Sequence, residues 1–184
     1  MTTLESHWAN FKTLIPSARA AFYESQILPL VIEGFRGHGA RDYALSIHSL
    51  GMSIEPVILA AKGLNAPRVV LLGTAQTLAL ASSITPWLDG CEVQSLEVER
   101  SGTRSVFTAV TTALEGVAGA IAFDVTGGTK AMVAALAMQA AALAAAGQSV
   151  DVYYLENTNW DAELRRPAPG GEHLVQLELP SYTS

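Results

Sequence analysis

The chain has 184 residues, of which 49% are apolar and 15% are charged, and its formal net charge is −6 at pH 7. This length suits one α/β domain with a sizeable core, and the few charged residues indicate extensive burial or a covered surface such as a dimer interface. An acidic chain lacks the basic face that broad binding to duplex nucleic acid requires, although it can still hold a small anion in one local positive pocket.

Other features of the composition indicate a cytoplasmic protein. The single Cys91 has no second cysteine to pair with, so we expect neither a disulfide framework nor a metal cluster. Glu5 and His7 stand where a secretory signal peptide would carry a basic start and an apolar core. The apolar run 132–146 is dominated by alanine and is too short to span a bilayer, so we expect a helix packed on a sheet and no membrane contact.

The first part of the chain has a helical pattern. Residues 3–14 and 16–34 place apolar side chains at helical spacing, and Pro16 suits a first helical turn. A polar connector that contains glycine follows at 37–42. We therefore expect an N-terminal helical segment over residues 1–41.

From there the pattern alternates between strand and helix. The predicted core strands are 43–49, 68–73, 91–98, 120–125 and 149–155. The helices predicted between them are 53–63, 74–86, 103–117 and 128–146. An edge strand is expected at 174–179, after a loop in which Arg165 and Arg166 are solvated. This alternation predicts an α/β, Rossmann-like fold with a mostly parallel sheet and helices on both faces. We assign this domain to residues 42–180 and a tail to residues 181–184.

The most informative segment is the turn between the strand at 120–125 and the next helix, which reads Asp124-Val125-Thr126-Gly127-Gly128-Thr129-Lys130. Its two glycines permit a sharp turn and let a ligand approach the backbone closely. Thr126 or Thr129 can cap the helix, whose free N–H groups favour negative charge, and Lys130 adds a full positive charge. The turn therefore has the components of a phosphate or carboxylate site, but an ordinary strand-to-helix turn with a solvated lysine accounts for the same residues.

Two familiar phosphate-binding loops are excluded by their spacing. A P-loop requires a glycine five residues before Gly128 and a hydroxyl residue directly after Lys130, and the chain has neither. The glycines within 34–39 lie in a polar connector in the wrong order for a dinucleotide-binding fingerprint. We therefore do not expect a nicotinamide cofactor.

Ligands of parallel α/β sheets bind beyond the carboxyl ends of the strands. We therefore expect the loops at 49–53, 73–77 and 126–130 to lie at one edge of the sheet. At the ends of the strands, His48 is expected to pack or form hydrogen bonds rather than act as a base, because no carboxylate or nucleophile stands at a telling spacing. Asp124 is expected to orient the glycine turn by accepting N–H bonds.

Several of these segments resemble one family. The motif Thr-Gly-Gly-Thr-Lys-Ala-Met at 126–132, between an apolar strand and an alanine-rich helix, resembles the signature of the CRISPR-associated Rossmann fold (CARF) domains. These domains sense cyclic oligoadenylate second messengers in type III CRISPR defence. Residues 44–56 resemble the first strand and turn of that family, residues 69–77 its second strand and polar loop, and residues 153–170 its tail. The resemblance covers roughly residues 42–180.

The resemblance implies a homodimer that binds a ring of adenylates across its two-fold axis, so that each copy presents the same loops to the ring. It implies no cofactor besides this ligand, and it favours cyclic tetra-adenylate. The ligand-binding residues that it implies are Ser49, Gly51, Thr74 and Gln76 on the adenine or ribose side, and Thr126, Gly127, Gly128, Thr129 and Lys130 in the turn. Thr74 and Gln76 could equally serve only to cap the helix that follows them.

Three functions remain open at this point. Many relatives in this family carry an effector module, so we expect a sensor that regulates a fused or separate effector. A protein that stands alone could be a metal-independent ring nuclease, with Thr129 and Lys130 as the candidate catalytic residues. The second alternative is a non-binding structural subunit whose alanine-rich helix builds an oligomer interface.

Overall fold

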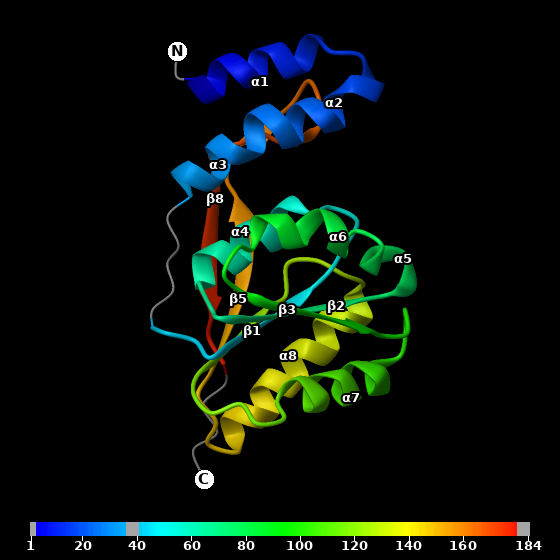
Figure 1. The fold of residues 1–184 in the computed structure, drawn as a ribbon, viewed down its shortest axis with the longest axis vertical. Coiled ribbons are helices and arrows are strands. Elements are labelled where there is room, and N and C mark those ends of the chain that lie inside the picture. Colours follow the sequence, from blue (N-terminus) through cyan, green and yellow to red (C-terminus); the bar gives the residue numbers. More distant parts are fainter. Residues whose placement is uncertain (1–2, 36–40, 180–184) are drawn as a thin grey trace. The chain divides into compact units, whose positions relative to one another are not determined.

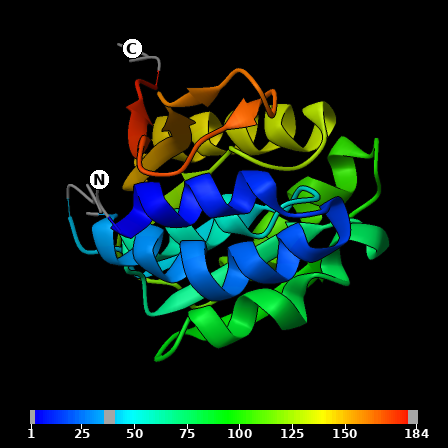
Figure 2. The same cartoon turned by 90° about the horizontal axis from the view of Figure 1, so that it is seen from above.

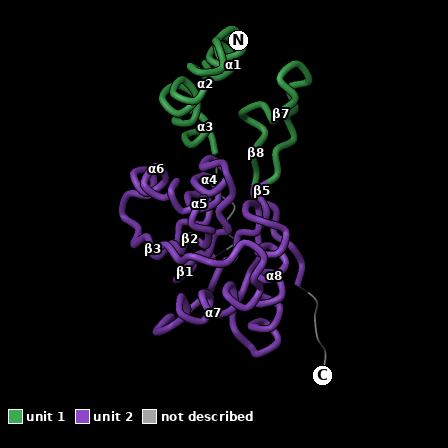
Figure 3. The backbone as a smooth tube through the Cα atoms, turned by 90° about the vertical axis from the view of Figure 1, so that its right-hand side faces the viewer, with its two compact units in different colours: residues 1–36, 156–173 green, residues 37–155, 174–184 purple. Residues whose placement is uncertain are grey.

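The computed structural model describes residues 3–35 and 41–179 (Figure 1). The chain forms two compact units, residues 1–36 with 156–173 and residues 37–155 with 174–184 (Figure 3). The first unit thus contains the segment 156–173, which the sequence-based division assigned to the main domain. The expected tail at 181–184 lies outside the described residues.

The first unit begins with helices. Its elements are α1 (Thr3–Thr13), α2 (Pro16–Phe22), the π-helical turn η1 (Tyr23–Ile27), α3 (Leu28–Gly34), β6 (Trp160–Asp161) and β7 (Arg166–Pro167). α1 lies beside the continuous run from α2 to α3 (Figures 1 and 2). The helices predicted at 3–14 and 16–34 are confirmed, apart from the π-helical turn within the second. Pro29 follows that turn and has no N–H to donate to the preceding turn, which disrupts the regular hydrogen bonding there.

An arginine surrounded by aromatic rings joins the two parts of this unit. The guanidinium carbon of Arg166 lies 5.4 Å from the ring centroids of Phe11 and Tyr23 and 5.7 Å from that of Trp8. Each contact is within the range of a cation–π interaction. The prediction of a solvated arginine pair is therefore wrong for Arg166, because aromatic side chains from distant helices gather around it.

Polar contacts to Asp161 support the same junction. Trp8 Nε1 donates to Asp161 Oδ2 at 3.0 Å, and Lys12 Nζ lies 3.6 Å from that oxygen. The N–H of Leu164 donates to Asp161 Oδ1 at 2.9 Å, and this backbone hydrogen bond is the main cause that lowers the pKa of the Asp161 carboxyl. The carboxylate of β6 thus connects α1 with the turn between β6 and β7.

A six-stranded sheet in the order β3-β2-β1-β4-β5-β8 forms the framework of the second unit. Its strands are β1 (Leu45–Ser49), β2 (Arg68–Gly73), β3 (Glu92–Glu97), β4 (Ile121–Asp124), β5 (Val150–Asn157) and β8 (Glu172–Leu177). The neighbours from β3 through to β5 pair in parallel. Its helices are α4 (Glu55–Leu64), α5 (Ala75–Leu78), α6 (Ala81–Ile84), the 3₁₀ turn η2 (Thr85–Trp87), α7 (Thr103–Ala113) and α8 (Lys130–Ala145). The predicted Rossmann-like fold is confirmed.

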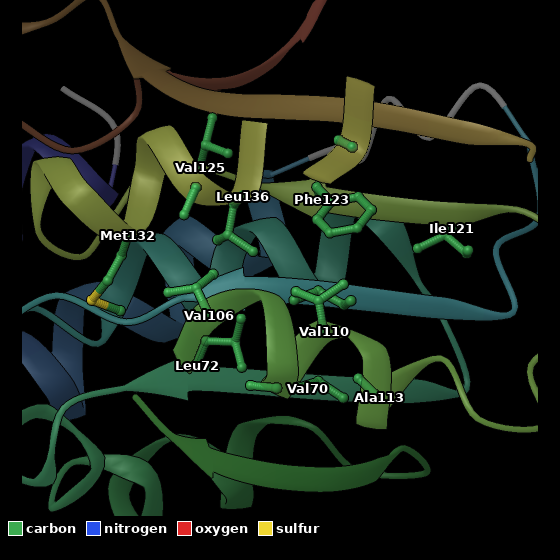
Figure 4. Close-up of a cluster of buried hydrophobic side chains, with 14 of the residues drawn as sticks. Val70, Leu72, Val106, Val110, Ala113, Ile121, Phe123, Val125, Met132 and Leu136 are labelled. Carbon is green, nitrogen blue, oxygen red and sulfur yellow. The ribbon is translucent and has the colours of Figure 1, made fainter. Parts of the chain in front are cut away.

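α7 and α8 cover one face of the sheet. Figure 4 shows Ile121 and Phe123 of β4 on the same side as Val110 of α7 and Leu136 of α8, and all four are buried. Side chains alternate between the faces of a strand, so the residues between them point to the other side. Burying one such aliphatic or aromatic side chain stabilises the fold by about 1.5–3 kcal/mol relative to its exposure. This cluster fixes α8 on the strand that precedes it.

The opposite face of the sheet is covered by α4, α5 and α6 (Figure 1). Here the single helix predicted at 74–86 is divided into α5, α6 and η2. The Thr77 hydroxyl accepts from the N–H of Thr74 at 3.0 Å, which makes a closed first turn. The serines and threonine that follow have low helix propensity, and Pro86 cannot donate a helical hydrogen bond. The helix therefore breaks instead of continuing.

α8 carries almost no charged side chains, and one side of the helix packs against the sheet. Its buried residues Met132, Ala135, Leu136 and Ala140 follow helical spacing, while Met138 is 62% exposed. α8 has 16 residues, and none of the helices within residues 3–35 and 41–179 is long and apolar enough to cross a membrane.

Replacing the enclosed arginine tests the junction in the first unit. We expect Arg166→Ala to lower the free energy of unfolding by about 2 kcal/mol, because it removes the cation from three rings. Urea denaturation followed by tryptophan fluorescence measures this change. Arg165→Ala is the matched control, since Arg165 is exposed and makes no ring contact with any described residue. Equal losses for the two variants would contradict the role of Arg166.

Candidate ligand-binding site

Three polar loops meet at the carboxyl ends of β1, β2 and β4. The N–H of Leu50 donates to the carbonyl of Leu72 at 2.8 Å, so the loop after β1 starts beside the end of β2. In the strand order, the chain leaves β1 toward β2 and leaves β4 toward β5, in opposite directions. Such a reversal separates the neighbouring loops and opens a crevice where α/β proteins bind ligands.

A cavity of about 130 Å³ lies at this edge. Of the residues predicted from the sequence, it is lined by Gly51, Thr74, Gln76, Gly128 and Thr129. The remaining lining residues are Leu50, Met52, Thr77, Arg100 and Met132. The expectation that the three loops meet is therefore confirmed. The lining combines hydroxyl, amide, apolar and cationic side chains and contains no carboxylate.

The glycine turn packs backbone to backbone against the loop after β1. A Cβ on Gly127 would lie 2.5 Å from the carbonyl oxygen of Ser49 and 2.9 Å from the nitrogen of Gly51. A Cβ on Gly51 would in turn lie 3.1 Å from the nitrogen of Gly128, whose φ of 84° favours glycine. From the sequence, we expected these glycines to let a ligand approach the backbone. The structure adds that the missing side chains of Gly51 and Gly127 let the two loops approach each other.

The buried Asp124 carboxylate anchors the start of the turn. Its Oδ1 accepts from the N–H of Thr126 at 3.0 Å and from the Thr126 hydroxyl, and its Oδ2 lies 3.1 Å from His48 Nδ1. His48 Nε2 lies 2.9 Å from the Ser46 hydroxyl, and these contacts are closed to solvent, since His48 and Asp124 are fully buried. The predictions that Asp124 orients the turn and that His48 forms hydrogen bonds near the strand end are confirmed.

Two residues proposed as ligand contacts hold the loops together in this structure. Ser49 is fully buried and its hydroxyl donates to the carbonyl of Gly127 at 2.7 Å. Thr126 Oγ1 accepts from the N–H of Leu155 at 2.7 Å, which joins the turn to β5. Neither Ser49 nor Thr126 lines the cavity. Both position the turn, of which Gly128 and Thr129 line the cavity.

Threonines at the cavity also begin the helices behind it. Thr129 is the N-cap of α8, where its Oγ1 accepts from the N–H of Met132 at 3.3 Å and donates to the carbonyl of Arg100 at 3.0 Å. Thr74 and Thr77 form a reciprocal capping box at α5. The capping roles are confirmed, and the contact of these threonines with a ligand stays a prediction.

The cationic side chains of Lys130 and Arg100 differ in their position relative to the cavity. Lys130 is exposed at the start of α8 and does not line the cavity, so its contact with a ligand stays a prediction. Arg100 does line it, and so does Met52, which is 65% exposed. The sequence-based prediction includes neither residue. Arg100 follows β3, and the rule that selected the loops after the other strands applies equally to β3.

No protein-family model matches the chain. The chain is 29% identical to the CRISPR system endoribonuclease Csm6 of Thermus thermophilus, over 188 aligned positions that cover 98% of this chain. Its fold resembles that of Can2 from Sulfobacillus thermosulfidooxidans, whose structure is a complex with cyclic tetra-adenylate, with a TM-score of 0.52 over 70% of this chain and 17% identity. Both likenesses support the resemblance of this chain to the CARF domains of type III CRISPR proteins.

The chain spans 40% of the length of Csm6 and 33% of that of Can2. The likeness to Csm6 extends over nearly the whole chain, including the glycine turn and the other strand ends, while the ligand-binding roles of these segments stay predictions. Within residues 3–35 and 41–179, no group of three or more His, Cys, Asp or Glu side chains could hold a metal ion. The chemistry of the cavity is that of its hydroxyl, amide, thioether and guanidinium groups.

The close approach of the two loops makes Gly127 sensitive to substitution. We expect Gly127→Ala to lower the free energy of unfolding by about 1–3 kcal/mol, because its Cβ meets backbone atoms that cannot rotate away. Thermal unfolding of the purified protein measures the change. Gly34→Ala is the control, since a Cβ there has no neighbour within 4 Å. An unchanged melting temperature for Gly127→Ala would contradict the packing described.

Proposed function

We propose that this chain is a CARF domain that binds a cyclic oligoadenylate in the cavity and acts as a sensor in type III CRISPR antiviral signalling. The observation that carries the proposal is the cavity at the switch point of the sheet, lined by the glycine turn and free of carboxylates. The likeness to Csm6 over nearly the whole chain supports this class of ligand. The complex of Can2 with cyclic tetra-adenylate favours that ring among the possible sizes.

The cavity offers a suitable group for each part of an adenylate. Thr74 and Gln76 carry polar atoms that can hydrogen-bond the ribose or the edge of the base. Met52 offers an exposed, polarisable thioether to the face of the purine. Gly128 and Thr129 stand at the start of α8, whose dipole favours a negatively charged phosphate.

A homodimer would complete the site. A drug-sized ligand fills a pocket of about 300–1,000 Å³, whereas the cavity of one chain measures about 130 Å³ and accommodates only part of a ring. A two-fold axis beside the cavity would present two copies of it to one symmetric ligand. We therefore propose that the ring binds across a homodimer and that the domain regulates a fused or separate effector.

Binding without cleavage is the function that the geometry favours. The hydroxyl hydrogen of Thr129 is donated to the carbonyl of Arg100, so Thr129 would have to give up this bond to act on a ligand. A ring nuclease would instead depend on Lys130 and on the attack of a ribose 2′-hydroxyl on its own phosphate. Cleavage of the ring therefore remains the alternative, to be decided by its products.

Thermal shift and product analysis distinguish these functions. We expect cyclic tetra-adenylate at about 100 times its Kd to stabilise the domain by about 2.7 kcal/mol, which raises the melting temperature by about 5–10 °C. Cyclic tri- and hexa-adenylate test the ring size, and linear tetra-adenylate controls for general nucleotide binding. The incubated ring is then analysed by chromatography.

The three possible results of this experiment correspond to the three candidate functions. An intact ring that stabilises the protein supports a sensor, and linear products identify a ring nuclease. A melting temperature that no ring changes would contradict the proposal and leave a structural subunit as the better description.

A further inference from the structure

Arg100 stands in a closed turn between β3 and α7. The N–H of Val98 donates to the carbonyl of Gly73 at 2.8 Å, which continues the pairing of β3 with β2 up to the turn. The Ser105 hydroxyl accepts from the N–H of Glu99 at 3.0 Å and donates to the carbonyl of Gly102 at 2.7 Å. Both sides of the turn are therefore attached to regular elements, and the backbone of Arg100 has a defined place between them.

The same turn is attached to the glycine motif. The carbonyl of Arg100 accepts the hydroxyl hydrogen of Thr129, the N-cap of α8, at 3.0 Å. This bond brings a residue of the loop after β3 to the cavity formed by the loops after β1, β2 and β4. The side chain of Arg100 is exposed and lines that cavity.

The guanidinium of Arg100 is free to bind a ligand. It forms no ion pair, hydrogen bond or ring contact with any residue in 3–35 or 41–179. Arg41, by contrast, lies 2.7 Å from Asp151, and Arg68 lies 3.7 Å from Glu92. Arg100 is also the one cation among the described residues that line the cavity, and it has no carboxylate beside it there.

An unpartnered guanidinium in such a place suits a phosphodiester. Its planar fork donates two parallel hydrogen bonds to two oxygens of a phosphate, and these charge-assisted bonds are shorter and stronger than neutral ones. In a chain of net charge −6, the cavity can attract an anion only through a local positive group. The motif lysine, Lys130, does not line the cavity, so it cannot replace Arg100 there.

We propose that Arg100 is a ligand-binding residue that holds a phosphodiester group of the ring with its guanidinium. This proposal rests on the proposed function, since it assigns a residue of the same site. It also gives the bond between Thr129 and Arg100 a role, because that bond keeps the phosphate-binding side chain beside the turn.

Isothermal titration calorimetry with cyclic tetra-adenylate tests the proposal. Arg100→Met keeps most of the aliphatic stem and removes the charge, and we expect it to weaken binding by tenfold or more and to make the affinity less dependent on salt. Arg100→Lys should recover only part of the loss, because an ammonium does not form the bidentate contact. The matched control is Arg104→Ala, an exposed arginine in the first turn of α7 that does not line the cavity, and its affinity should stay within about twofold of the wild type.

The melting temperature without ligand separates binding from folding. Because the Arg100 guanidinium has no partner within the described residues, Arg100→Met should unfold at the temperature of the wild type. Wild-type affinity in Arg100→Met would overturn the proposal while leaving the proposed function intact, and so would a loss of affinity matched by a loss of stability. If the wild type binds no ring, the proposed function itself fails and this proposal fails with it.

Discussion

The carboxylate of Asp124, buried at the end of β4, is the interaction on which the site depends. A buried carboxylate is costly unless donors surround it, and here His48 of β1 and both donors of Thr126 do so. Thr126 in turn accepts from Leu155 of β5. One acidic residue thus connects three neighbouring strands at the point where the glycine turn begins, and the turn starts from a rigid base.

The residues above this base divide into two groups. Ser49, Gly51 and Gly127 bring the loops after β1 and β4 into backbone contact, and they determine how close these loops are. Thr74 and Thr129 cap helices and also face the cavity. The motif that resembles a ligand-binding signature is therefore largely an assembly of structural contacts, and the side chains that are free to meet a ligand stand around it.

The fold could be predicted from the sequence because its signals are local. Short apolar runs, each followed by a helix, lead to a parallel sheet, and the carboxyl-edge rule then locates the site. The burial of Ser49 could not be predicted, since a serine at a strand end looks the same whether it faces a ligand or a neighbouring carbonyl. The place of Arg166 depends on aromatic side chains near the other end of the chain, with no periodicity to indicate them. The carboxyl-edge rule could have selected the loop of Arg100 after β3, but the bond from Thr129 that holds this loop beside the glycine turn has no signal in the sequence.

α8 connects the cavity with a distant part of the protein surface. The helix starts at Thr129, which is bonded to the turn after β3, and its 16 residues extend about 24 Å to Ala145. A tilt of about five degrees at Thr129 would displace the far end of so long a rod by about 2 Å. Met138 and the small alanine side chains on its outer surface would move with it. A small rotation at the N-cap of α8 would therefore appear as a larger displacement of this exposed surface.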